Sequence, residues 1–179
     1  MDFDIKRELG QPAVEIRPPV RLKTELVRRD APDIRTVLIH KGLMVMLDRA
    51  ITTPDRIIGT LQIAPERCIG YGFVKQEDLM LRGVDLIEMA AQLLGMWGAR
   101  FDELFEKRTA FVLAETGAAR FYRPVRTGET VAMEISAENI RVKRITTSGR
   151  FIIVGRDFAA KVDEEVRANI SEIVLISTA

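Results

Sequence analysis

Three polar residues stand at helical spacing in an otherwise apolar segment of the chain. Between Val84 and Gly98 the strongly polar residues are Asp85, Glu88 and Gln92. With about 100° between successive residues of a helix, their side chains fall within roughly 60° of one another and form a narrow polar stripe. A carboxyl group in this position could act as a general acid or base, and two carboxylates on one face are a means of activating water.

The composition limits which other chemistry is possible. His40 and Cys68 are the only histidine and the only cysteine, which excludes a zinc site built from these residue types and an intramolecular disulfide. A net charge of +1 indicates neither a nucleic acid nor an anionic membrane as a partner. The sequence has no signal-peptide pattern and no apolar run long enough to span a membrane. We therefore expect a soluble, cytoplasmic protein that needs no metal, flavin or nicotinamide.

The polar stripe must be carried by a helix that packs inside the protein. Residues 84 to about 104 predict one long helix, and because it is apolar on almost every side, a sheet should cover it. Residues 43–51 and 56–63 predict a hairpin before the helix. Four strand-like stretches follow at residues 109–121, 130–140, 150–162 and 165–176, and the short turns between them favour antiparallel neighbours.

An antiparallel sheet of five to six strands around one long central helix predicts an α+β structure with the hot-dog fold. Residues 1–32 are rich in proline and charge and predict an extended N-terminal arm, whereas residues 33–179 predict a single hot-dog domain. A helix that is apolar on all sides needs more cover than one sheet face supplies, so we expect at least a dimer.

Three segments carry recognisable patterns. The opening segment (residues 40–49) reads HKGLMVMLDR, the helix segment (residues 82–92) reads RGVDLIEMAAQ, and the RPV segment (residues 119–129) reads ARFYRPVRTGE. In this order they resemble the family of beta-hydroxyacyl-acyl-carrier-protein dehydratases (FabA/FabZ-like). The matching family patterns are His-Arg-Tyr-Pro-Phe-Leu-Leu-Val-Asp-Arg, Pro-Gly-Val-Leu-Ile-Leu-Glu-Ala-Leu-Ala-Gln and Ala-Arg-Phe-Arg-Arg-Pro-Val-Val-Pro-Gly-Asp. The resemblance implies that Glu88 corresponds to the catalytic acid of the family.

One part of the family pattern is missing. Between Glu66 and Gly83 the family has a Gly-His-Phe-Pro-Gly segment that carries its catalytic histidine, and Gly72 stands at that position here. His40 does not replace it, because His40 matches a different family histidine at the start of the opening segment. The only tyrosines in the chain, Tyr71 and Tyr122, are the candidates for a substitute proton donor.

The resemblance implies a protein that binds acyl thioesters carried on the phosphopantetheine of acyl carrier protein or on coenzyme A. The implied reaction is dehydration of a beta-hydroxyacyl thioester, with Glu88 as the acid–base residue and Asp85 and Tyr71 as helpers. Backbone amides near the helix N-terminus would hold the thioester carbonyl. The expected substrate-binding residues are Gly72, Phe73, Gly83, Val84, Gln92, Arg120 and Phe121.

Two alternatives stand beside dehydration. Thioesterases on hot-dog folds use a helix carboxylate, and Asp85, where the family has an apolar residue, favours hydrolysis. A non-catalytic subunit that binds acyl chains or a carrier protein is the second alternative. Simpler roles are also open: Asp85 could favour the helix dipole, Glu88 and Gln92 could form a buried pair at an interface, and Arg120 could be structural or contact an acidic carrier protein. The expected assembly is a homodimer or a trimer of dimers.

Overall fold

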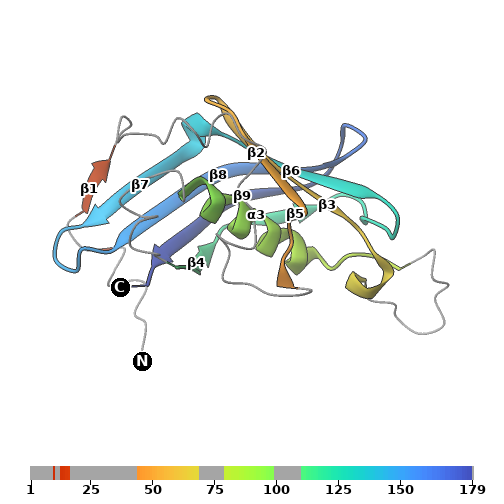
Figure 1. Ribbon diagram of the computed structural model, residues 1–179, viewed down its shortest axis with the longest axis horizontal. Helices are drawn as coiled ribbons and strands as arrows, with labels where there is room; N and C mark the ends of the chain where they lie inside the picture. The colour runs from red at the N-terminus through yellow and green to blue at the C-terminus, as the bar shows by residue number, and fades with distance from the viewer. Residues whose placement is uncertain (1–9, 11–12, 17–43, 69–78, 99–109, 179) are drawn as a thin grey trace.

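The structure is a computed structural model that describes residues 10, 13–16, 44–68, 79–98 and 110–178. In these ranges the chain forms one α-helix, two short 3-10 helices and a nine-stranded sheet (Figure 1). The helices are α3 (Gly83–Gly98), η3 (Pro65–Arg67) and η5 (Ala137–Asn139). The strands are β1 (Ala13–Ile16), β2 (Arg49–Thr52), β3 (Arg56–Gln62), β4 (Phe111–Thr116), β5 (Ala119–Phe121), β6 (Thr130–Ser136), β7 (Ile140–Ile145), β8 (Phe151–Val162) and β9 (Glu165–Ser177).

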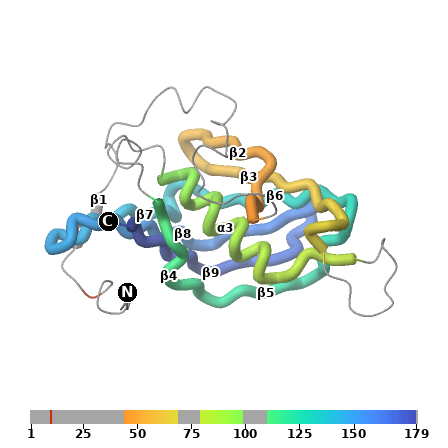
Figure 2. Tube along the Cα trace, turned by 60° about the horizontal axis from the view of Figure 1, so that its bottom comes forward, coloured from red at the N-terminus to blue at the C-terminus, as the bar shows by residue number. Residues whose placement is uncertain are grey.

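The sheet is antiparallel and lies along one side of the helix. Its order is β1-β7-β8-β6-β3-β2, and β9 pairs with β8 and carries β4 and β5 on its other edge. The first part of β8 pairs with β7 and the last part with β6. Figure 2 shows α3 lying across the sheet face between β3 and β5. This is the single helix covered by an antiparallel sheet that the sequence predicts.

The regular strand geometry is interrupted at the same level in three neighbouring strands, although the hydrogen bonds between them continue. Asp157 in β8 has a φ of 59°, a left-handed conformation, and its register places it opposite Ser171 in β9. On the far side of β9, the Ser171 amide donates to the Ala118 carbonyl and the Gly117 amide donates to the Glu172 carbonyl. Gly117 and Ala118 separate β4 from β5, although both strands pair with β9. The predicted strand 109–121 is therefore two strands, β4 and β5, which lie along the same edge of β9.

The core lies between α3 and the sheet. Eleven of the sixteen helix residues are buried, which confirms that the helix is covered on almost every side. Glycines allow close packing: a Cβ on Gly59 would lie 2.5 Å from Leu47 Cδ2, and one on Gly98 would lie 2.5 Å from Ile153 Cδ1. Val84 is the exception, because 61% of it is exposed at the start of the helix.

Several predicted boundaries were wrong. The sheet has nine strands in the described part of the chain, where five to six were predicted. The predicted strand 130–140 ends as β6 at Ser136, and β7 (Ile140–Ile145) was not predicted. The first predicted strand, 43–51, is strand only from Arg49. Part of the N-terminal arm, β1, pairs with β7. The predicted end of the helix lies outside the described residues. No helix in the described ranges is long and apolar enough to cross a membrane.

Candidate functional site

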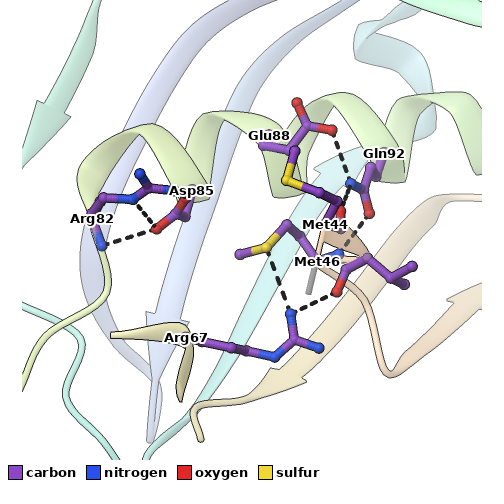
Figure 3. Close-up of polar contacts among 8 residues, drawn as sticks. Met44, Met46, Arg67, Arg82, Asp85, Glu88 and Gln92 are labelled. Carbon is purple, nitrogen blue, oxygen red and sulfur yellow. Dashed lines mark hydrogen bonds and ion pairs between the residues drawn. The ribbon is translucent and has the colours of Figure 1, made fainter. Parts of the chain in front are cut away.

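Gln92 joins the helix to the opening segment. Its Oε1 accepts a hydrogen bond from the Met46 amide at 2.8 Å, and its Nε2 donates to the Met44 carbonyl at 2.7 Å (Figure 3). The same Nε2 donates to Glu88 Oε1 at 2.9 Å. Gln92 is only 2% exposed, so these bonds are shielded from water. The Met46 amide fixes which end of the Gln92 side chain is oxygen, and the nitrogen must therefore point toward Glu88.

Glu88 lies one helical turn before Gln92 and is half-buried. Its carboxylate is held by a buried amide that is itself held by backbone groups 46 and 48 residues away along the chain. A carboxyl group used as a general acid or base must be kept at a defined position relative to its substrate. The geometry of Glu88 meets that requirement.

Asp85 has a different set of partners. Arg82 donates from Nε to Asp85 Oδ2 at 2.9 Å, from Nη2 to Oδ1 at 2.6 Å and from its backbone amide to Oδ2 at 3.2 Å. Asp85 is 7% exposed, whereas about half of the Arg82 side chain is exposed. The pair fixes the first turn of α3, where a negative charge is favourable. Asp85 and Glu88 thus lie on one helix, as predicted from their spacing, with separate partners (Figure 3).

The ring of Phe121 lies against the start of the helix. A Cβ on Gly83 would lie 2.8 Å from Phe121 Cζ, so no larger side chain fits at position 83 unless the ring moves. None of the turn and cap hydrogen bonds among the described residues uses the amides of Gly83 or Val84. The first amides of a helix lack partners within the helix and can bind an anionic or carbonyl oxygen. Phe121, itself about half exposed, covers that position.

Arg120 faces away from the helix. Its neighbour in β9 is Asn169, which is exposed, whereas Ala119 and Phe121 lie beside the buried core residues Ile170 and Ala168. Since paired residues on neighbouring strands share a face of the sheet, Arg120 is on the outer face and Phe121 on the helix face.

The rest of the RPV segment is held by ion pairs and turn bonds. Glu129 Oε2 accepts from the Arg126 amide at 2.6 Å, and Glu129 Oε1 is 3.1 Å from Arg167 Nη2. Arg167 also donates to the Pro124 carbonyl at 3.0 Å. Arg123 is paired with Glu165 at 2.6 Å. These contacts fix the turn that leads into β6 and indicate a structural role for this part of the segment.

Some expected site residues cannot be located. Tyr71, Gly72, Phe73 and His40 lie outside the described residues, so their roles remain predictions. The sequence interpretation also missed Arg82, whose i,i+3 spacing to Asp85 was the available signal. A second missed residue is Arg67, which donates to the Val45 carbonyl at 2.8 Å and supports the opening segment from below the helix in Figure 3. Among the described residues, no group of three ligand side chains could hold a metal ion.

Comparison with known proteins shows sequence similarity to FabZ dehydratases. No family model matches the chain. It is 28% identical over 138 residues to the 3-hydroxyacyl-[acyl-carrier-protein] dehydratase FabZ of Caldanaerobacter subterraneus subsp. tengcongensis, covering 76% of this chain and 89% of that protein. It is 25% identical over 148 residues to FabZ of Thermoanaerobacter pseudethanolicus, covering 82% and 95%.

Solved structures share the fold. A chain of the dehydratase heterocomplex ApeI:P from Xenorhabdus doucetiae aligns with a TM-score of 0.55 and 17% identity, over 84% of this chain and 93% of that chain. Cj0977, a sigma28-regulated virulence protein from Campylobacter jejuni, aligns with a TM-score of 0.50 and 12% identity, over 89% and 94%. The chain is a FabZ-like hot-dog protein. The predicted α+β class and the recognised resemblance are both confirmed for this FabZ-like protein.

Proposed function

We propose that this FabZ-like protein binds acyl thioesters beside Glu88 and that Glu88 performs an acid–base step in the dehydration of beta-hydroxyacyl thioesters. The observation that carries the proposal is the convergence of the three segments. Gln92 of the helix segment bonds to Met44 and Met46 of the opening segment, and Phe121 of the RPV segment lies on Gly83. Segments that resemble FabZ in sequence are thus brought together on the helix that carries Glu88.

The chemistry of dehydration defines what each group would do. A base removes the proton from the carbon next to the thioester carbonyl, the bond from the beta carbon to the hydroxyl oxygen breaks, and an acid protonates that oxygen so that it leaves as water. The amides of Gly83 and Val84 would stabilise the charge on the thioester oxygen. Glu88 would be the acid that protonates the leaving oxygen. The reaction requires no metal, flavin or nicotinamide, and the acyl group would arrive on acyl carrier protein or coenzyme A.

The base is the part of the machinery without an assigned residue. The only histidine in the chain is His40, and Gly72 stands at the family position of the catalytic histidine. Loss of a positioned base lowers a rate by a factor of about 10²–10⁴. Tyr71 is assigned only as a helper that could donate a proton, and no residue of this chain is assigned as the base. Turnover slower than that of a complete dehydratase is therefore expected.

A non-catalytic acyl-binding subunit is the second candidate, and the single histidine favours it. Such a subunit would keep the site around Glu88 and pair with an active dehydratase. The fold likeness to a chain of a dehydratase heterocomplex is compatible with this arrangement. Hydrolysis has less support, because the Asp85 carboxylate that suggested it accepts three hydrogen bonds from Arg82.

The test is a two-channel assay of the purified full chain. Beta-hydroxyacyl, crotonyl-type and saturated acyl thioesters are supplied on coenzyme A and on carrier protein, and enoyl absorbance and free thiol are followed together. Glu88→Gln is compared with wild type, and Glu164→Gln, in the exposed β8–β9 turn, is the matched control.

The outcomes separate the candidates. Reversible hydration that is lost in Glu88→Gln and retained in Glu164→Gln supports the dehydratase proposal. Thiol release overturns it in favour of hydrolysis. Silence in both channels, with thioester binding measured by calorimetry, leaves the acyl-binding subunit. Absence of both turnover and binding refutes the proposed function altogether.

A further inference from the structure

Arg67 and Glu88 lie at opposite ends of one series of hydrogen bonds. Arg67 Nη1 donates to the Val45 carbonyl at 2.8 Å. The amide of Met46 belongs to the same peptide group as that carbonyl, and it donates to Gln92 Oε1 at 2.8 Å. At the other end of this side-chain amide, Nε2 donates to Glu88 Oε1 at 2.9 Å. Figure 3 shows all three bonds. This Arg67–Glu88 relay connects a cation to the candidate acid–base residue through two amide groups.

Every bond in the relay donates in the same direction. The guanidinium is the donor at one end and the carboxylate is the acceptor at the other, so the two amide dipoles between them are aligned head to tail. Hydrogen bonds in series polarise one another, and each bond is strengthened by roughly 10–30%. The positive charge at the donor end adds to this effect, because bonds with a charged donor are stronger than neutral ones. The bond from Gln92 to Glu88 therefore depends on Arg67.

The middle of the relay is shielded from water. Met46 is 5% exposed and Gln92 is 2% exposed, and Arg67 and Val45 are partly buried. In these surroundings water competes less for the bonds and screens the guanidinium charge less than it would at the surface. Arg67 Nη1 also lies 3.8 Å from Met46 Sδ. The cation is therefore held against the residue whose peptide group it polarises.

The relay is also fixed in position at both ends. Arg67 is the last residue of η3, a turn closed by backbone hydrogen bonds of 3.0 Å. That turn follows β3, and β3 pairs with β2 at the end of the opening segment. At the helix, a reversal of the Gln92 amide would break three hydrogen bonds. Neither the donor end nor the amide next to Glu88 can turn away without loss of these bonds.

We propose that Arg67 is a positioning residue for Glu88 and acts through the Val45–Met46 peptide group and the Gln92 amide. The guanidinium strengthens and orients the hydrogen bond that Gln92 donates to Glu88 Oε1. The carbonyl-type oxygen of a carboxyl group is the better acceptor, so protonated Glu88 would hold its proton on Oε2. The relay thereby fixes which carboxyl oxygen delivers the proton to the leaving hydroxyl. This inference rests on the proposed acid role of Glu88 and assigns Arg67 no contact with the substrate.

A spectroscopic test measures the bond between Gln92 and Glu88 directly. In isotope-labelled full-length protein, nuclear magnetic resonance of the Gln92 side-chain amide protons reports the strength of the bonds that they donate, and Glu88→Gln identifies the proton that faces Glu88. Arg67→Met should move that proton upfield, because a weaker hydrogen bond deshields its proton less. Arg67→Lys keeps a positive charge and should return part of the shift. The side chain of Gln62, exposed on β3, is the internal control and should not move.

A kinetic test determines whether Arg67 acts through Gln92. Arg67→Met should lower kcat for beta-hydroxyacyl thioesters by about two- to tenfold, the effect of one hydrogen bond, and leave KM within about twofold. Arg67→Lys should recover part of kcat. In a Gln92→Met background, Arg67→Met should have no further effect, because the relay is already broken. Arg156→Met, which replaces an exposed arginine of β8 paired with Glu172, is the matched control and should equal wild type. Circular dichroism verifies that each variant is folded.

Three results would overturn the inference. An unchanged Gln92 resonance in Arg67→Met would mean that the cation does not influence the bond to Glu88. A shift that Arg67→Lys does not reduce would assign the effect to displaced packing. An equal loss of kcat with and without Gln92 would mean that Arg67 acts by another route.

Failure of the proposed function gives a different result. A wild-type chain without turnover would refute dehydration, whereas the Gln92 resonance would still decide whether Arg67 controls the bond to Glu88. The same resonance and its recovery in Arg67→Lys decide the question alone if Gln92→Met is too unstable to assay.

Discussion

Gln92 Nε2 lies 2.9 Å from Glu88 Oε1, and the orientation of that amide is set by the Met46 amide on a different part of the chain. The position of the candidate acid–base group therefore depends on the packing of the opening segment against the helix. A disturbance of that packing would reach Glu88 through one side chain.

Gln92→Met should destabilise the fold by about 2–4 kcal/mol. Methionine fills the space but leaves the Met46 amide and the Met44 carbonyl without their partner in a buried place. Urea unfolding followed by fluorescence measures the change. The control is Gln62→Met, exposed on β3, which should stay within about 0.5 kcal/mol of wild type. Equal stability of the two variants would mean that the buried hydrogen bonds do not form in solution.

Arg82→Met should cost about 1–2 kcal/mol, a value below that of a fully buried pair because about half of the Arg82 side chain is exposed. It leaves the buried Asp85 carboxylate without its cation. The double variant Arg82→Met with Asp85→Leu should be less destabilised than the sum of the single changes, with a coupling of about 0.5–2 kcal/mol. Chemical denaturation of all four proteins gives the cycle. Strict additivity would show that the ion pair does not contribute.

Asp85→Leu should retain thioester binding, since both oxygens of the Asp85 carboxylate accept hydrogen bonds from Arg82. Calorimetric titration with a non-hydrolysable acyl-coenzyme A analogue measures the affinity, and we expect a change of less than about threefold. Glu88→Ala is the comparison that should alter binding. If Asp85→Leu abolished activity and left the fold intact, Asp85 would be a catalytic helper, as the sequence resemblance implies.

Gly95→Ala should stabilise the protein by up to about 1 kcal/mol, because alanine favours the helix and the new Cβ would lie 3.9 Å from Leu175 Cδ1, an ordinary contact. The same substitution at Gly98 should destabilise by about 1–3 kcal/mol, since its Cβ would lie 2.5 Å from Ile153 Cδ1. Thermal unfolding of the two variants tests both signs at once. A stabilised Gly98→Ala would mean that the helix is less closely packed on the sheet.

Asp157→Gly should be neutral or slightly stabilising, whereas Asp157→Val should destabilise by about 1–3 kcal/mol. The φ of 59° at this position is accessible to glycine and strained for a β-branched residue. Thermal unfolding distinguishes the two. Val166→Asp, a surface change without this backbone constraint, is the control. A small effect of Asp157→Val would show that the backbone of β8 is regular at residue 157 in solution.

The secondary structure that depends on neighbouring residues could be predicted from the sequence. Apolar residues around Asp85, Glu88 and Gln92 predicted the helix and its polar stripe, because helical spacing depends only on neighbouring residues. The alternation at residues 130–136 and 165–170 predicted strands for the same reason. The RPV segment and the helix segment together supported the resemblance that the comparisons then confirmed.

Contacts between distant segments could not be predicted from the sequence in the same way. Gln92 bonds to the backbone groups of Met44 and Met46, which the sequence assigned to a strand, whereas β2 begins only at Arg49. The charged residues of β7, which read RVKR, obscured the alternation of a strand that is exposed on one face. Phe121 and Gly83 lie 38 positions apart in the chain, and nothing local in either segment indicates that one covers the other.

The break at Gly117 and Ala118 changes which face of the sheet the following residues occupy. Thr116 and Ala119 both lie beside core residues of β9, Ile173 and Ile170, although they are three positions apart. Insertion or deletion of one residue at this break would leave the composition almost unchanged and would turn Glu115 and Arg120 to opposite faces of the sheet.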